Sequence, residues 1–523
     1  MKNILFILCA LVASTFVRAD PFDDVVIATS YKNVTSHNPI NVIKFTADPG
    51  VMVYDDTVYV YGTNDGHIQN LGETPEENNY SLIRSINVMS SKDLVNWVDH
   101  GALPTGDAAQ WAIKTWAPAA THKTINGKEK FFLYFANGSK GIGVLTSDSP
   151  TGPFIDPIGD YLINHNTTNC EKVTWLFDPA VFIDDDGTGY LYFGGGVPGE
   201  SSNAFDDYEL YKDNPKYERP ATLRAVKLGD DMISLASDPV VIDAPWLYED
   251  SGMHKVDGVY YYTYCQNFKT PWAKARIGMM TSKSPLGPFE YVDTIFNNEG
   301  DWFGQYGNNH HTVIEFHGKW YIFYHSEWLN VQLYHDEMGY RTTHVDYLPY
   351  ENGKFLNATG SFEGVKQLVN VNAFETQQAS LMAWAAGVNT NGTGKTTVTY
   401  EKGEWTGVSQ VDFEDGASAI KLVASSANGA VIKITIGEVN GEVIGYVTIP
   451  VSMEFQTVTA EILPVSGVKN VFFIASDEVT IDTWEFIKTN EDSEDEVIDV
   501  TANVAAMNDA EDSAEDSDND PFF

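Results

Sequence analysis

Residues 180–193 read Ala-Val-Phe-Ile-Asp-Asp-Asp-Gly-Thr-Gly-Tyr-Leu-Tyr-Phe, two runs of β-forming residues around an acidic, glycine-containing turn. β-Branched and aromatic residues favour strands, and Asp–Gly sequences favour the positive φ angles of tight hairpin turns. This stretch therefore predicts a β-hairpin. The same pattern occurs four more times in the chain, and that repetition decides the fold.

Each copy has a short β-type run, a turn with acidic residues, glycine or Asn–Gly, and then an aromatic-rich strand; the copies are 51–61, 119–135, 180–193, 253–264 and 312–324. They start roughly 60 to 70 residues apart, which is enough for a four-stranded blade with its loops. A β-sandwich also contains many hairpins, but five long repeats with one internal pattern are typical of a propeller. We predict an all-β chain that begins with a five-bladed β-propeller.

The composition changes near residue 360. Residues 366–488 are poorer in Tyr and richer in Val, Ile, Thr, Ala and Gly, in short alternating runs such as 430–436. This segment predicts a separate jelly-roll-like β-sandwich, which leaves 20–365 for the propeller. Residues 489–523 contain thirteen Asp or Glu and no Lys or Arg, so we expect a solvated, disordered tail there.

The first nineteen residues have the pattern of a secretory signal. Lys2 is followed by a mostly apolar stretch over 4–16, and Val17-Arg18-Ala19 places small residues at the positions before a cleavage site. The apolar run is too short to be a membrane anchor. We therefore expect a secreted, extracellular protein. Cys170 and Cys265 remain after cleavage, and the sequence leaves open whether they pair.

The charge of the chain excludes some partners. Seventy-three acidic and 32 basic residues give a formal net charge of −41 at pH 7. Nucleic acids and anionic membranes need clustered Lys and Arg, so both are poor partners for this surface. A neutral polysaccharide meets no such objection, and an aromatic content of 13% suits sugar stacking.

Polar residues occupy the same position just before the repeats. They are Asp48 before the first, Asp178 before the third, Glu249 before the fourth and His310 before the fifth. Innermost propeller strands start beside one axis, so these side chains are expected to converge in one pocket. An isolated Asp before Pro is ordinarily a turn former. Repetition in the same phase argues against that interpretation here.

Clustered carboxyl groups indicate a particular chemistry. Carboxylates that share a buried pocket repel one another and lose hydration, so the pKa of at least one must rise. Glycoside hydrolysis needs such a set, with a protonated acid for the leaving oxygen and an ionised partner across the sugar.

About residues 38 to 360 resemble glycoside hydrolase family 43, on five runs: Phe45-Thr-Ala-Asp-Pro-Gly50, Thr115-Trp-Ala-Pro-Ala119, Trp175-Leu-Phe-Asp-Pro-Ala-Val-Phe182, Tyr248-Glu-Asp-Ser-Gly-Met-His-Lys255 and Asn309-His-His-Thr-Val313. The resemblance implies that Asp48 is the general base that activates water and that Glu249 is the general acid. Asp178 would tune the pKa of the acid and orient it. The family inverts anomeric configuration. Asp250 competes for the acid role, and the motif register favours Glu249.

The resemblance also implies three supporting residues. His310 matches a histidine that helps to hold a hydrated calcium ion, although a structural histidine is equally consistent and calcium prefers several oxygens. Trp116 matches an aromatic residue that shapes the sugar pocket, and its alternative is a core tryptophan. Arg341 matches an arginine that reaches the substrate, and its alternative is a surface arginine.

The second domain resembles carbohydrate-binding module family 6, on the runs 379–388, 407–417 and 481–486. Two positions depart from that family. The residue after Ala379 is Ser380 rather than a calcium-binding Glu, and the usual sugar-binding Asn is Thr480. The sequence therefore leaves open whether the module binds calcium or sugar. Phe455 either stacks on sugar or packs on an edge strand.

The motif resemblance and the appended module favour removal of α-L-arabinofuranosyl side chains from arabinoxylan or a related hemicellulose. A β-xylosidase or an endo-arabinanase of the same family remains an alternative, because loop closure over the pocket decides between exo and endo action. A non-catalytic sugar-binding propeller does not need three carboxyl groups together. We expect a monomer whose partner is plant cell-wall polysaccharide, arabinoxylan or arabinan, and neither nucleic acid nor membrane.

Overall fold

The computed structural model describes residues 21–68, 76–199, 215–267 and 274–489. Its first part consists of antiparallel sheets in chain order. The first sheet contains β1 (Ala47–Tyr54), β2 (Thr57–Thr63), β3 (Ile86–Ser91) and β4 (Trp97–Leu103), and the second contains β5 (Trp116–Ile125), β6 (Lys128–Ala136), β7 (Gly141–Ser147) and β8 (Ile163–Asn164).

The next three sheets continue the same order. The third contains β9 (Ala180–Ile183), β10 (Gly189–Phe193), β11 (Leu223–Lys227) and β12 (Val240–Ile242). The fourth contains β13 (Leu247–Val256), β14 (Val259–Gln266), β15 (Ile277–Ser282) and β16 (Glu290–Phe296). The fifth contains β17 (His311–Phe316), β18 (Lys319–Ser326) and β19 (Thr342–Tyr347), and a short ladder of β20 (Tyr350–Glu351) and β21 (Lys354–Phe355) follows it.

The repeated turns form the hairpins that the sequence predicts. Asn126 and Gly127 join β5 to β6 with φ angles of 52° and 75°, and Asp257 and Gly258 join β13 to β14 with 50° and 72°. Two consecutive positive φ angles match the right-handed twist of the flanking strands. The local hairpin prediction is confirmed at these turns.

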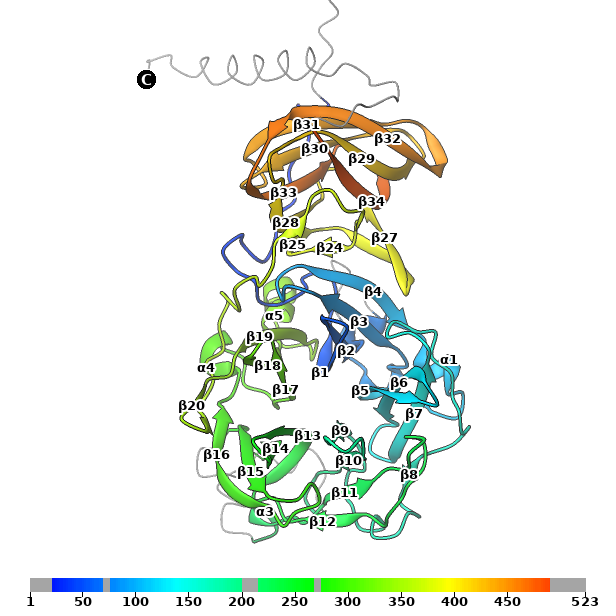
Figure 1. The fold of residues 1–523 in the computed structure, drawn as a ribbon, viewed down its shortest axis with the longest axis vertical. Helices are drawn as coiled ribbons and strands as arrows, with labels where there is room; N and C mark the ends of the chain where they lie inside the picture. The colour runs from blue at the N-terminus through cyan, green and yellow to red at the C-terminus, as the bar shows by residue number, and fades with distance from the viewer. Residues whose placement is uncertain (1–20, 69–75, 200–214, 268–273, 490–523) are drawn as a thin grey trace, which may run out of the picture.

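Buried apolar residues fill the spaces between neighbouring sheets. Separate clusters join the first sheet to the second, the second to the third, the third to the fourth and the fourth to the fifth. A further cluster closes the ring, because it joins Phe323 of β18 to Val60 of β2. Figure 1 shows β1, β5, β9, β13 and β17 facing the middle of this ring. The arrangement is propeller-type, and the all-β prediction is confirmed.

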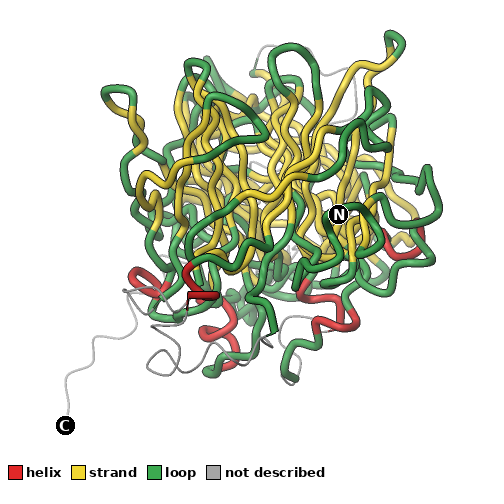
Figure 2. The backbone as a smooth tube through the Cα atoms, turned by 90° about the horizontal axis from the view of Figure 1, so that it is seen from below, coloured by secondary structure: helices red, strands yellow, loops and turns green. Residues whose placement is uncertain are grey.

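The short helices gather at one side of the strands (Figure 2). They are η1 (Asp65–Ile68), η2 (Tyr80–Leu82), α1 (Thr105–Ala108), α3 (Pro215–Glu218), α4 (Gly300–Phe303) and α5 (Trp328–Tyr334). η1 follows β2, whose last residue Thr63 pairs with Ala47 at the start of β1. The loops that carry these helices therefore lie on the face where the innermost strands begin.

The second part of the chain is a β-sandwich, as predicted. One sheet contains β22 (Val371–Asn372), β28 (Trp405–Asp412), β33 (Val468–Ala475), β30 (Ala430–Ile436) and β31 (Glu442–Ile449), with β25 (Trp384–Ala386) paired to β28. The other contains β26 (Asn389–Thr393), β27 (Lys395–Tyr400), β34 (Val479–Lys488), β29 (Ala417–Ser426) and β32 (Ser452–Val465), with β23 (Gln377–Gln378) paired to β34.

The sandwich and the propeller-type part share backbone pairing. The strand β24 (Leu381–Met382) adds to β4 as an outer strand of the first sheet. Asn96 reaches from the β3–β4 connection to Ser409, where its amide donates to the carbonyl (3.1 Å) and accepts from the N–H (2.7 Å). Buried polar groups are costly to leave unpaired, so these contacts fix the two parts to each other.

The N-terminal segment packs on the C-terminal sandwich. Trp405 Nε1 donates to the carbonyl of Ala28 (2.7 Å), and Ser30 Oγ donates to the carbonyl of Ala385 (2.8 Å). Phe22 lies in the same apolar cluster as Trp405. The first described residues of the chain therefore cover part of the C-terminal sandwich.

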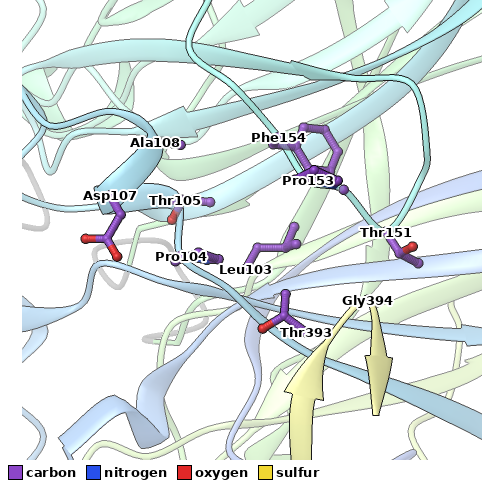
Figure 3. A pocket seen from close by; sticks show the side chains of 11 residues that line it. Leu103, Pro104, Thr105, Asp107, Ala108, Thr151, Pro153, Phe154, Thr393 and Gly394 are labelled. Atoms are coloured by element: carbon purple, nitrogen blue, oxygen red, sulfur yellow. The ribbon is translucent and has the colours of Figure 1, made fainter.

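A cavity of about 480 Å³ lies where the sandwich hairpin β26–β27 meets the first two sheets (Figure 3). Its apolar lining includes Leu103, Pro153 and Phe154, and Thr393 contributes from the sandwich. No residue of the predicted carboxyl site is among its lining residues. The cavity is a feature of the domain junction.

Some sequence predictions fall on other parts of the chain. The predicted signal at 1–19 and the acidic tail beyond residue 489 lie outside the described residues. Among the residues that the structure describes, no helix has the length and apolar character that crossing a bilayer requires. Cys170 and Cys265 are both buried free thiols.

Candidate active site

The starts of the first four innermost strands share an unusual backbone conformation. Asp48, Ala117, Asp178 and Asp250 have φ angles of 48°, 41°, 50° and 62°. Pairing is interrupted by a register shift at this point in β1, β5 and β13. This conformation costs a non-glycine residue about 1–3 kcal/mol of folding free energy, and residues that adopt it cluster at functional sites. Irregular pairing also re-aims side chains at the end of a strand.

Three carboxyl groups, those of Asp48, Asp178 and Asp250, lie around His310. The His310 Nδ1 atom lies 3.5 Å from Asp48 Oδ1 and 3.9 Å from Asp178 Oδ2, and its Nε2 atom lies 3.3 Å from Asp250 Oδ1. Asp178 Oδ2 also accepts a hydrogen bond from the backbone N–H of Asp250, beside Glu249 (3.0 Å). All of these side chains are buried. Residues from four repeats thus lie together in one buried cluster.

Asp48 is held as a carboxylate. Its Oδ1 atom accepts a hydrogen bond from Arg341 NH1 (2.7 Å), and its Oδ2 atom accepts one from Thr63 Oγ1 (2.7 Å). Burial alone would raise the pKa of Asp48, but Arg341 and the imidazoles of His310 and His325 outweigh it and hold that pKa well below its usual range. Asp48 is therefore ionised, which is the form that a proton acceptor must have.

Glu249 and Asp178 are shifted in the opposite direction. Burial raises the pKa of Glu249, and the charges of Asp48 and Asp250 raise it further against the hydrogen bond from Asn308. Burial also raises the pKa of Asp178, with added repulsion from Glu249 and Asp48. The site therefore holds an ionised carboxylate and a protonated carboxyl group together, which is the arrangement that acid–base catalysis on a glycosidic bond requires.

The contacts of Asp250 separate it from its neighbour. Asp250 is fully buried, and its Oδ2 atom accepts hydrogen bonds from the backbone N–H of His311 (3.1 Å) and from His311 Nδ1. Among the described residues, the carboxyl group of Glu249 accepts one hydrogen bond, from Asn308 Nδ2. Asp250 is thus engaged in the interior network, whereas Glu249 makes fewer hydrogen bonds, and its role as the acid stays a prediction.

Arg341 is a buried member of the site and not a surface residue. Besides Asp48, its guanidinium group binds Asp65, and its carbon CZ lies 5.3 Å from the ring centroid of Tyr80. Sequence reasoning missed Asp65, Tyr80 and Thr63. Asp65 and Tyr80 lie in the segment between β2 and β3, outside the repeated pattern, so no repeat position indicates them.

Trp116 lies at the start of β5, next to this network. Its Nε1 atom donates to the carbonyl of Tyr80 (2.8 Å), and Lys114 Nζ lies 4.4 Å from its ring centroid. The following N–H, that of Ala117, donates to the Thr63 hydroxyl that binds Asp48. Trp116 is half-buried and also packs on the core between the second and third sheets.

The atoms beside His310 do not form a calcium site by themselves. Calcium takes six to eight oxygen ligands. Asp48 Oδ1 is engaged by Arg341 and Asp250 Oδ2 by His311, which leaves Asp250 Oδ1 without a hydrogen-bond partner. Within the described ranges, no group of three or more His, Cys, Asp or Glu is placed to hold a metal ion. Calcium near His310 stays a prediction.

Ser380 and Thr480, the two positions that depart from the family pattern of the sandwich, take part in structural hydrogen bonds. Ser380 is buried, and its carbonyl accepts from the N–H of Asp99 in β4 (3.3 Å). Thr480 shares a hydrogen bond with Thr399 across β34 and β27 (2.9 Å). Phe455 is 46% exposed, so edge-strand packing does not account for its whole ring.

Two family models match the chain. Residues 36–355 match the model described as glycosyl hydrolases family 43, and residues 378–488 match carbohydrate binding module (family 6). The first match includes all the residues of the carboxyl site. The second covers the sandwich.

Relatives with known activities match both parts. An arabinoxylan arabinofuranohydrolase of Paenibacillus polymyxa is 39% identical over 86% of this chain and 74% of its own length. One of Bacillus subtilis (strain 168) is 38% identical over 88% of this chain and 94% of its own length. A crystal structure of a family 43 arabinoxylan arabinofuranohydrolase from Bacillus subtilis, in complex with cellotetraose, has a TM-score of 0.82 and 37% identity over 88% of this chain and 99% of that protein.

Proposed function

Because the chain belongs to glycosyl hydrolase family 43, we propose that it removes α-L-arabinofuranosyl side chains from arabinoxylan with inversion of configuration. Two arabinoxylan arabinofuranohydrolases that match most of the chain support this substrate. The chain is a glycosidase, and the observation that carries the mechanism is the opposite ionisation of Asp48 and Glu249 within one buried cluster.

The proposed reaction is a single displacement at the anomeric carbon. Asp48 takes a proton from a water molecule whose oxygen attacks that carbon, while Glu249 gives its proton to the glycosidic oxygen as the carbon–oxygen bond breaks. Arg341 and Thr63 occupy one oxygen each of Asp48, which fixes the carboxylate plane. The expected separation of acid and base is the wider one of inverting enzymes, about 6.5–9.5 Å.

Three residues assist in this proposal. Asp178 orients the strand that carries the acid through its hydrogen bond to the N–H of Asp250, and it tunes the acid because repulsion between the two carboxyl groups disfavours their simultaneous ionisation. Trp116 shapes the sugar pocket from the start of β5. Arg341 contacts substrate with the N–H groups that Asp48 and Asp65 leave free.

We propose the following architecture and context as well. Residues 20–365 form a five-bladed propeller, supported by the sheets that pack in a ring, and 366–488 form the carbohydrate-binding sandwich. Residues 1–19 act as a secretory signal, so the enzyme works outside the cell. It acts as a monomer on plant cell-wall polysaccharide, arabinoxylan or arabinan. A hydrated calcium ion would bind near His310 at the centre of the propeller, with water molecules among its ligands.

A substrate panel tests the proposed function. Wheat arabinoxylan, linear arabinan, 4-nitrophenyl α-L-arabinofuranoside and 4-nitrophenyl β-D-xyloside are incubated with the full chain, and released monosaccharides are separated by anion-exchange chromatography. Arabinose without shortening of the xylan backbone is the expected product. Release of xylose from the xyloside as the dominant activity, or of arabino-oligosaccharides from arabinan, would overturn the proposal.

A further inference from the structure

A second buried carboxyl group, Asp65, lies behind the proposed base. It begins η1, directly after β2, and its side chain has no exposed surface. Its Oδ2 atom accepts hydrogen bonds from the backbone N–H (3.0 Å) and the Nε–H (2.9 Å) of Arg341, and its Oδ1 atom accepts one from NH2 (3.1 Å). Asp65 therefore holds both the main chain and the side chain of one arginine.

The same guanidinium group connects Asp65 to Asp48. Arg341 NH1 donates to Asp48 Oδ1 at 2.7 Å, while Nε and NH2 face Asp65. A guanidinium group is planar and carries five N–H donors in fixed directions. Once two of its nitrogens are bound to Asp65, the direction of the third toward Asp48 is set. The ring of Tyr80 stacks on the group at 5.3 Å.

We propose that Asp65 is a positioning residue for the reaction: it clamps Arg341, and Arg341 in turn fixes the orientation and the charge of the base Asp48. This inference rests on the proposed function. Among the described residues, no hydrogen bond joins Asp65 to Asp48, so the positioning passes through the arginine, while the two acidic groups repel each other directly.

The clamp places a second buried acidic group on the arginine. Asp48 and Arg341 alone form a neutral pair, so Asp65 adds a negative charge, and burial together with the charge of Asp48 raises the pKa of Asp65 against its contacts with Arg341. A single Asp48–Arg341 pair leaves the arginine side chain free to turn toward a sugar hydroxyl and away from the base. With Asp65 present, three N–H groups of the guanidinium are committed, one to Asp48 and two to Asp65, and two remain for substrate.

The primary variant is Asp65→Asn, which keeps the side-chain volume but replaces one acceptor oxygen with an NH2 group that faces the arginine. We expect kcat on 4-nitrophenyl α-L-arabinofuranoside to fall about 10- to 100-fold, as for a small misplacement of a reacting group, with KM within about twofold of wild type. The matched control is Asp55→Asn at the exposed β1–β2 turn of the same sheet, with wild-type kinetics expected. Assays run below the lowest melting temperature among the variants.

A double-mutant comparison separates positioning from general structural support. If Asp65 acts only through the arginine, Asp65→Asn combined with Arg341→Ala will lose no more activity than Arg341→Ala alone. Losses that multiply, or an unchanged kcat in folded Asp65→Asn, would overturn the proposal.

If Asp65→Asn does not fold, Arg341→Lys supplies the test. One ammonium group cannot reproduce the three directed contacts and also lacks the N–H groups assigned to substrate, so kcat should fall and KM should rise, and a wild-type kcat would overturn the clamp. A wrong substrate assignment is distinguishable, because wild type itself would then fail on the arabinofuranoside. The same comparison is then made on the aryl glycoside that wild type cleaves.

Discussion

Replacement of Glu249 by Gln tests the proposed acid most directly. Glutamine has nearly the same volume, and its carbonyl oxygen can still accept the hydrogen bond from Asn308 Nδ2, so the buried packing is preserved. The variant lacks only the proton that the leaving oxygen needs. General acid catalysis contributes about 10²- to 10⁴-fold, which corresponds to about 2.7–5.5 kcal/mol of activation free energy.

That loss should depend on the leaving group. Arabinose released from arabinoxylan departs from a poor leaving group, so the full loss is expected in kcat/KM for the polymer. 4-Nitrophenolate needs little protonation, and the loss on the aryl arabinofuranoside should be far smaller. Initial rates on the two substrates measure the difference. Exposed Glu290 in β16 of the same sheet provides the control, and Glu290→Gln should match wild type on both substrates.

The pH profile provides an independent measurement on the same variant. Burial raises the pKa of Glu249, and the acid is active when protonated, so wild-type kcat/KM on the polymer should stay high at neutral pH and fall as the pH rises through that pKa. On the polymer, this alkaline fall should disappear from the residual activity of Glu249→Gln. Equal losses on both substrates, or an unchanged alkaline fall, would refute the assignment.

Three other outcomes follow from the structure. Asp48→Asn should be folded and nearly inactive because an amide cannot accept the proton of water, and proton NMR of the first product of wild type should show the inverted anomer; a retained anomer contradicts the role of Asp48. A chain that ends after Val365 should melt at a lower temperature in circular dichroism, because β4 loses β24 and the N-terminal segment loses its cover; a full-length melting temperature contradicts this. Burial lowers the pKa of Lys32 from 10.5 to about 7. Between these pH values the unfolded state binds more protons than the folded state, so the contribution of Lys32 to the free energy of unfolding rises with pH. Urea titrations at pH 7 and 9 should therefore show a smaller rise in the free energy of unfolding for Lys32→Met than for wild type, and equal rises would contradict this role of Lys32.

The parts of the fold that the sequence predicts are those with local causes. The turn at Asn126 and Gly127 needs two positive φ angles, and these residue types tolerate them at little cost. Asp48 and Asp178 were identifiable because each stands at the same position before its repeat. The convergence of these positions follows from the repeat itself, without knowledge of any contact.

The remainder depends on contacts between distant segments. Asp65 belongs to no repeated position, and its importance arises from Arg341, which lies 276 residues later. The pairing of β24 with β4 uses two residues whose side chains carry no distinctive pattern. The packing of Phe22 on the sandwich is equally invisible in local sequence, because an apolar residue shows that it will be buried but not against which surface.

The position of the N-terminal segment sets an order of events during synthesis. Ala28 and Ser30 bond to residues 377 and 355 positions later, so their partners leave the ribosome roughly 18 to 75 seconds after them at ordinary elongation rates of about 5–20 residues per second. During that interval the ring of sheets can assemble, but the first segment has no surface on which to dock. The last module to be made therefore completes the folding of the first segment, and a ribosome that stalls before residue 405 leaves a chain whose N-terminal segment lacks this site.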